Sequence, residues 1–195
     1  MLLQGKNLKM REQSILSDLE IYIRVAYKNA RENDFDFNGL TDRQIAEDMM
    51  TWDDYFFDMA VFVSSKSKDR STKVGCVIVG PNHEVRTTGY NGFCRGINDD
   101  LDYRHARPEK YYWAEHAERN AIFNAARNGI RIEDCTAYVT MFPCADCARA
   151  LIQSGIKRVV TVQLKGHTHI PQESYYRSDI MMQEAGVEID YHKKN

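Results

Sequence analysis

The sequence lacks the features that direct a protein to a membrane, to secretion or to nucleic acid. It contains no apolar run of about 18 residues, the length that a membrane-spanning helix needs, and residues 1–14 include no apolar core of a secretory signal. It also lacks a dominant charge, because 28 acidic residues nearly balance 26 basic ones and the formal net charge is -2. Without a positive field, a polynucleotide partner is not favoured. We therefore expect a cytoplasmic protein with no membrane or nucleic-acid partner.

The sequence also lacks the cysteine pattern of a disulfide-bonded protein. The chain has five cysteines, an odd number, and no secretory signal, which together argue against a disulfide framework. Reduced thiols are therefore free to bind a metal ion. We find no internal repeat, low-complexity tract or linker, and 195 residues are enough for one compact domain with its own core.

The first part of the chain has a helical pattern of its own. Apolar residues recur at helical spacing over residues 15–27, and a polar stretch at 33–39 ends the pattern. Residues 41–50 predict a second short helix with Thr41 as its cap. We interpret residues 1–51 as an appended helical extension for packing or oligomer contacts, and residues 52–195 as the main domain.

The main domain alternates between strand and helix patterns. Apolar, β-branched runs predict strands at residues 74–79, 84–88, 137–141, 159–162 and 187–191. Helical patterns occupy residues 52–63, 116–127, 144–153 and 174–184, and a glycine follows each of the last three, as expected at a helix C-terminus. This order predicts an α/β fold, a three-layer α/β/α sandwich with a mixed central sheet of about five strands.

One pair of short motifs carries the chemistry. Cys144 and Cys147 are three residues apart at the start of a predicted helix, so both sulfurs lie on one face of its first turn. The positive end of the helix dipole favours their thiolate forms, and Pro143 suits the entry to such a helix. With His116 as a third ligand and no second CxxC pair, the site keeps one position open for water, as catalytic zinc sites do.

Glu118 completes this constellation. It lies two residues from His116, a spacing that on a helix directs the two side chains differently, so we expect Glu118 to face the water rather than the metal. Zinc lowers the pKa of a bound water to about 7, and a carboxylate beside it can carry the protons of a hydrolysis. The order His-x-Glu followed by Pro-Cys-x-x-Cys is the signature of the zinc deaminases.

Simpler interpretations of the same residues exist. A CxxC pair alone also occurs in redox proteins, although this one lacks a thioredoxin-like flank and has the His-x-Glu partner. A single histidine is more often a core or surface residue than a ligand. The joint motif in this order favours a catalytic zinc site.

Further landmarks make the chain resemble the deoxycytidylate (dCMP) deaminase family. The resemblance covers about residues 52–191, and the stretch 125–129 is most similar to members encoded by tailed bacteriophages, whose compartment is the cytoplasm of the infected cell. The landmarks are WDDYF at 52–56, SKD at 67–69, TKVG at 72–75, GYNG at 89–92, HAERNAI at 116–122, TMFPC at 140–144 and QSGIK at 153–157.

The resemblance implies a cytidine deaminase-like fold and the hydrolysis of dCMP to dUMP and ammonia, which supplies dUMP for dTTP synthesis. It implies a homohexamer activated by dCTP and inhibited by dTTP with Mg²⁺. Asn91 would contact the substrate sugar, and Ala117 would also line the substrate site. The effector site maps to Tyr90, Asn91, Gly92, Arg95, Asn98, Asp99 and Arg127.

Recognition of the 5′-phosphate is less clearly marked. Lys68 and Lys73 lie in a basic stretch that offers the needed charge, although such runs are more often solvated surface. The tyrosine that the family usually has after its GIK strand is displaced, and Lys165 is a substitute for it. Residues 93–96 depart from the family's small residue, Pro and Gly, which bears on effector binding. Cys76, Cys94, His83 and His105 do not form the spacing of a second, structural zinc site.

Three other functions compete with this one. A tRNA adenosine or polynucleotide cytidine deaminase shares the zinc motif, but the balanced charge and the long segment between Gly92 and His116 favour a closed mononucleotide pocket. A non-catalytic zinc-stabilised domain would need four protein ligands and would give Glu118 no role. A deaminase of riboflavin synthesis would be expected to carry a reductase domain as well.

Overall fold

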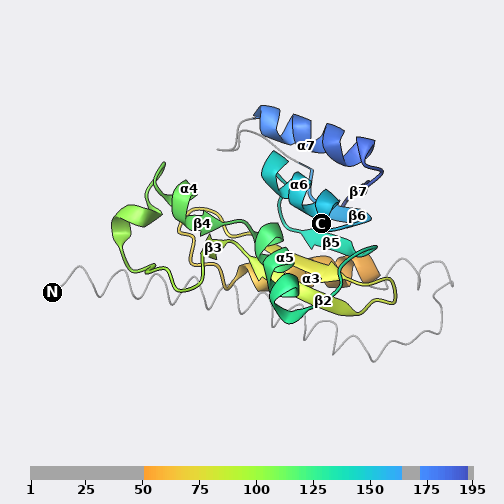
Figure 1. The fold of residues 1–195 in the computed structure, drawn as a ribbon, viewed down its shortest axis with the longest axis horizontal. Helices are drawn as coiled ribbons and strands as arrows, with labels where there is room; N and C mark the ends of the chain where they lie inside the picture. Colours follow the sequence, from red (N-terminus) through yellow and green to blue (C-terminus); the bar gives the residue numbers. More distant parts are fainter. Residues whose placement is uncertain (1–50, 164–171, 193–195) are drawn as a thin grey trace, which may run out of the picture. The chain divides into compact units, whose positions relative to one another are not determined.

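A mixed five-stranded sheet organises the part of the chain that the computed structural model describes, residues 51–163 and 172–192 (Figure 1). The strand order is β2-β1-β5-β6-β7. β1 pairs antiparallel with both β2 and β5, whereas β5, β6 and β7 run parallel. The strands are β1 (Gly75–Val79), β2 (Val85–Tyr90), β5 (Thr136–Val139), β6 (Arg158–Thr161) and β7 (Glu188–Tyr191).

Helices cover both faces of this sheet. The helices are α3 (Trp52–Ser64), α5 (Ala117–Asn128), α6 (Ala145–Gln153) and α7 (Gln172–Glu184). α3 packs on one face, while α5 and α6 pack on the other, with α7 beside α6 (Figure 1). The predicted three-layer sandwich is confirmed, and each predicted element lies within two residues of the observed one at either end. The helical extension predicted for residues 1–51 lies outside the described residues, apart from Thr51, which caps α3.

The sequence of β1 shows how the two layers form. Successive strand side chains point to opposite faces, so Cys76 and Ile78 enter the core under α5 and α6, and Val77 and Val79 enter the core under α3. All five residues of β1 are buried, as expected for a strand covered on both sides. This continuous apolar run explains why the sheet is central rather than solvated on one face.

Helix α5 sits unusually close to β2, and this contact positions the site. A Cβ added to Gly89 would lie 2.3 Å from the carbonyl oxygen of Ala117 and 2.3 Å from the amide nitrogen of Ala121. Only glycine therefore fits at this point of β2. The close approach fixes the first turn of α5, and with it His116 at the N-cap.

The segment between β2 and α5 contains short elements that the sequence did not predict. β3 (Gly92–Phe93) pairs antiparallel with β4 (Ala114–Glu115), and between them lie the 3-10 helix η1 (Asp102–His105) and the one-turn helix α4 (Lys110–Trp113). These elements bring Lys110 to the loop that precedes β1, where it contacts Asp69 and Ser71. Across the described residues, none of the helices combines the length and apolar character needed to cross a bilayer.

Candidate active site

Three potential metal ligands meet at the N-terminal ends of two helices. His116 is the N-cap residue of α5, Cys144 is the N-cap residue of α6, and Cys147 lies in the first turn of α6. The Nδ1 atom of His116 lies 3.5 Å from the Sγ of Cys144 and 3.4 Å from the Sγ of Cys147. Among the described residues, this is the one group of three or more His, Cys, Asp or Glu side chains close enough to share a metal ion.

The spacing of these atoms fits zinc. Tetrahedral zinc binds sulfur at about 2.3 Å and nitrogen at about 2.0–2.1 Å, which places such nitrogen and sulfur ligands about 3.6 Å apart. The two observed nitrogen to sulfur distances, 3.5 and 3.4 Å, agree with that value. Two sulfurs and one ring nitrogen, with no fourth protein ligand among the residues that the structure describes, make an open site of the catalytic type.

The electrostatics of the cluster favour a thiolate. A hydrogen bond from Cys147 and a second from His116 lower the pKa of Cys144 to about 4, against the opposing effect of burial. The same contact with Cys144 raises the pKa of His116 to about 9. Cys147, which donates to its neighbour and is buried, has its pKa raised well above the ordinary value. The lowered pKa of Cys144 favours its thiolate, the form in which cysteine binds a metal ion.

Glu118 lies against this cluster from the first turn of α5. Its side chain is only 4% exposed, and burial raises the pKa of its carboxyl group, an effect that the neighbouring His116 partly offsets. A carboxyl group with a raised pKa in a buried site can both accept and return a proton near neutral pH. His116 is the N-cap residue and has an extended backbone, whereas Glu118 has a helical one. This difference in backbone conformation lets both side chains reach the metal site although they are only two residues apart.

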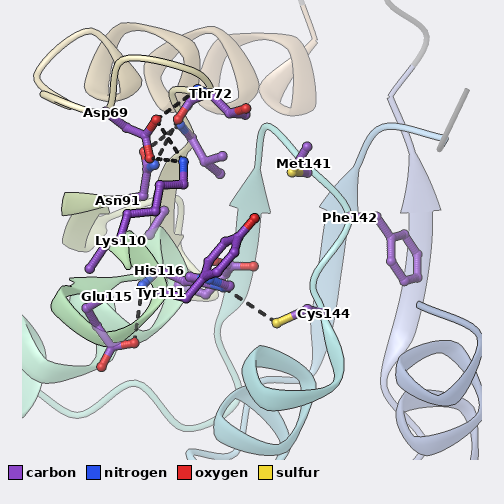
Figure 2. Close-up of a pocket in the computed structure, with 14 residues that line it drawn as sticks. Asp69, Thr72, Asn91, Lys110, Tyr111, Glu115, His116, Met141, Phe142 and Cys144 are labelled. Atoms are coloured by element: carbon purple, nitrogen blue, oxygen red, sulfur yellow. Dashed lines mark hydrogen bonds and ion pairs between the residues drawn. The ribbon is translucent and has the colours of Figure 1, made fainter. Parts of the chain in front are cut away.

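A cavity opens above these residues (Figure 2). Apolar side chains form part of its wall, including Val74, Ala117, Met141 and Phe142. Its polar lining comes from several segments and consists of Asp69, Thr72, Asn91, Lys110, Tyr111, Glu115, His116, Glu118 and Cys144. Apolar walls with a few convergent polar groups are typical of small-molecule sites.

Comparison with known proteins decides the family. Residues 50–163 match the profile described as the cytidine and deoxycytidylate deaminase zinc-binding region. The chain belongs to the cytidine and deoxycytidylate deaminase family. The family resemblance predicted from the motifs is thus confirmed.

Individual relatives in this family come from animals and from phages. The deoxycytidylate deaminase of Mus musculus is 38% identical over 126 residues, which are 62% of this chain and 70% of that protein. The deoxycytidylate deaminase of Enterobacteria phage T4 is 35% identical over 181 residues, with 70% of this chain and 88% of that protein covered. The dCMP deaminase from the cyanophage S-TIM5, solved in complex with dCMP and dUMP, matches with a TM-score of 0.58 and 25% identity over 71% of this chain and 94% of that one.

Within this family frame, the two substrate contacts implied by resemblance reach the cavity. Ala117 is buried and lines it beside the metal ligands. Asn91 lines it from the junction of β2 and β3, with the oxygen and the nitrogen of its side-chain amide each bound to the backbone. Their contact with substrate stays a prediction.

Of the three lysines predicted to hold phosphate, the two that the structure describes do not line the cavity. Lys68 is exposed and pairs with Asp99 at 2.6 Å, lining a smaller neighbouring cavity instead. Lys73 is exposed and is not among the residues that line either cavity. Lys165 lies outside the described residues.

The residues mapped to an effector site are spread over the surface next to the cavity. Tyr90 is exposed at the end of β2, and Gly92 and Asp99 line the smaller cavity. Arg95 donates to Asn124 of α5, and Asn98 accepts from the amide of Asp100. Arg127 lies in the last turn of α5, about 16 Å along the helix from His116, since each helical residue rises about 1.5 Å. Effector binding by these residues stays a prediction.

Sequence reasoning missed four residues of the cavity wall, three of them charged. Asp69 and Lys110 form a buried ion pair there, with Nζ 2.8 Å from Oδ2. Tyr111 and Glu115 were missed as well, and Glu115 pairs with Arg119 while accepting from the His116 amide. Asp69 belongs to the SKD landmark at 67–69, so the sequence could have marked it as a candidate site residue. No sequence pattern marks Lys110.

Proposed function

We propose that this chain hydrolyses dCMP to dUMP and ammonia, with zinc held by His116, Cys144 and Cys147 and with Glu118 as the proton carrier. The observation that carries the proposal is the meeting of one ring nitrogen and two sulfurs beside a cavity that His116, Cys144 and the buried carboxyl group of Glu118 line. The choice of substrate is supported by relatives named deoxycytidylate deaminase and by the cyanophage enzyme solved with dCMP and dUMP.

The chemistry divides between the metal and the protein. When bound, zinc supplies a Lewis acid that lowers the pKa of a water molecule to about 7. Glu118 would accept one proton of the attacking water and deliver it to N3 of the cytosine ring as the water oxygen bonds to C4. It then passes the second proton to the amino group as the bond from C4 to nitrogen breaks, so that ammonia leaves. The carboxylate ends as it began, and its raised pKa suits both transfers.

The rest of the cavity is suited to a pyrimidine nucleotide. Val74, Met141 and Phe142 offer apolar contacts to a flat base, and burial of the site excludes bulk water from the reaction. Asn91 lines the cavity beside Val74 and close to Lys110, where a sugar hydroxyl would lie (Figure 2). Lys68, Lys73 and Lys165 stay predictions as phosphate ligands.

Substrate choice is the direct test. Ammonia release should be measured from dCMP, CMP, deoxycytidine, single-stranded DNA and tRNA under identical conditions. We expect turnover of dCMP to exceed that of the others. Turnover of tRNA or DNA without turnover of dCMP would replace the proposal with a polynucleotide deaminase, and no turnover of any compound with zinc bound would favour a non-catalytic zinc domain.

Regulation and assembly extend the proposal by family resemblance alone. We expect a homohexamer that is activated by dCTP and inhibited by dTTP with Mg²⁺, and that supplies dUMP for dTTP synthesis in the cytoplasm. Titration of each nucleotide against dCMP turnover, with sedimentation velocity in parallel, tests both points. Flat responses to both nucleotides would mean that the unusual residues 93–96 accompany a loss of regulation.

A further inference from the structure

Asp69 and Lys110 form an ion pair that is buried, which costs desolvation free energy, and that lies in the cavity wall. Lys110 is the first residue of α4. Its side chain is 9% exposed, and that of Asp69 is 11% exposed. Burying two charges is expensive even when they are paired, so such pairs are weak evidence of added stability. This pair lies in the wall of the cavity that contains the metal ligands (Figure 2). Its position suggests that it shapes that wall.

Asp69 organises the loop that precedes β1. Its Oδ1 atom accepts from the backbone amides of Ser71 at 2.8 Å and Thr72 at 3.0 Å. Burial alone would raise the pKa of Asp69. The Lys110 ammonium group and these backbone bonds outweigh that effect and hold the pKa well below its usual value. The Nζ atom of Lys110 also donates to the Ser71 hydroxyl at 2.7 Å. The pair therefore closes the loop and ties it to α4.

The closed loop in turn holds Asn91. The Nδ2 atom of Asn91 donates to the carbonyl oxygen of Thr72 at 2.8 Å, and its Oδ1 accepts from the amide of Val74 at 2.8 Å. A side-chain amide has two N–H donors and two acceptor lone pairs, so one of each remains. A ligand hydroxyl group can accept from the remaining N–H or donate to the remaining lone pair. Asn91 and Thr72 both line the cavity, which places this amide where a ligand can reach it.

We propose that the Asp69–Lys110 ion pair is a positioning device that fixes the Asn91 amide toward a sugar hydroxyl of the nucleotide. The proposal rests on the proposed function, because dCMP supplies that hydroxyl at its 3′ position. Lys110 is a positioning residue and not a ligand of the phosphate. Its three N–H donors face three acceptor atoms of the protein, the two carboxylate oxygens of Asp69 and the Ser71 hydroxyl.

The test pairs a variant with a truncated substrate. Lys110→Met removes the ammonium group and keeps a side chain of similar length. For this variant and the wild type, kcat/KM is measured with dCMP and with 2′,3′-dideoxycytidine 5′-monophosphate, which lacks the 3′-hydroxyl. We expect a loss of about tenfold or more with dCMP, the value of one hydrogen bond, and a change of less than about threefold with the dideoxy compound. Lys66→Met, the same change at an exposed lysine that lines neither cavity, is the control and leaves both values unchanged.

Two further variants guard the interpretation. Lys110→Arg keeps the charge and should recover part of the loss with dCMP. If Lys110→Met does not fold because Asp69 is left unpaired, the double variant Asp69→Ala with Lys110→Met removes both charges and the loop contacts, and the same selective loss is expected. Equal losses with both substrates, or dCMP turnover within about twofold of wild type, would overturn the positioning role. A wild-type protein that does not act on dCMP would instead overturn the proposed function.

Discussion

The guanidinium group of Arg158 donates to both carboxylate oxygens of Asp53, at 2.9 Å to Oδ1 and 2.7 Å to Oδ2. Its Nε atom donates to Asp190 at 2.6 Å, and the Tyr138 hydroxyl donates to the same Oδ1 of Asp53 at 2.8 Å. Asp53 lies in the first turn of α3, whereas Arg158, Asp190 and Tyr138 lie in three neighbouring strands. This network ties the helix of one layer to the sheet, away from the catalytic cavity.

Arg158→Met should therefore lower stability without changing the chemistry. The pair is partly exposed, with side chains 25% and 38% exposed, so we expect a loss of about 1–2 kcal/mol in the free energy of unfolding, between the values for surface and buried pairs. Urea unfolding measures it. Arg131→Met, which breaks the exposed pair with Glu133, is the control and should change stability by less than about 0.5 kcal/mol. Identical urea midpoints for the two variants would contradict this role.

The same network predicts a pH dependence below neutrality. The hydrogen bond from Arg158 lowers the pKa of Asp53, so the folded state favours the charged carboxylate. A lowered carboxyl pKa contributes stability above the unfolded value of about 3.9, and this contribution is lost as the pH falls through the folded pKa. The difference in unfolding free energy between wild type and Asp53→Asn should thus be constant above about pH 5 and shrink below pH 4. A difference that grows as the pH falls would mean that the sign is wrong.

Glu118→Gln should separate metal binding from turnover. The amide has nearly the same shape but cannot carry a proton, so we expect kcat for dCMP to fall by about a thousandfold while the zinc content stays near one per chain. Ammonia release and elemental analysis of the same sample check both points. Turnover that survives the change would exclude Glu118 as the proton carrier.

Removal of one sulfur should weaken zinc binding itself. Cys147→Ser takes away a ligand that is completely buried against His116, and we expect loss of zinc on dialysis against a mild chelator, with loss of thermal stability as metal binding no longer favours the folded state. Cys94→Ser, at an exposed thiol outside the cluster, is the matched control and should keep its zinc. If both variants retained zinc equally, Cys147 would not be a ligand.

Much of the fold was predictable because its determinants are local. The continuous apolar run of β1 and the glycines after α5 and α6 depend on neighbouring residues alone, and the glycines adopt positive φ as such helix ends require. The elements β3, β4, η1 and α4 are too short to show a period, so their existence depends on packing. Gly89 shows the same limit, because nothing in its sequence context reveals that α5 presses on its Cα.

By itself, the sequence was enough to predict the metal ligands and the proton carrier, because His116, Glu118, Cys144 and Cys147 stand at short fixed spacings at two helix starts. The tertiary structure alone decided which lysine lies in the cavity. Lys68 and Lys110 have the same side chain, yet only Lys110 meets a buried aspartate, 41 residues away along the chain, while Lys68 stays in solvent. Burial of a charge depends on contacts between distant segments, and no local pattern encodes those.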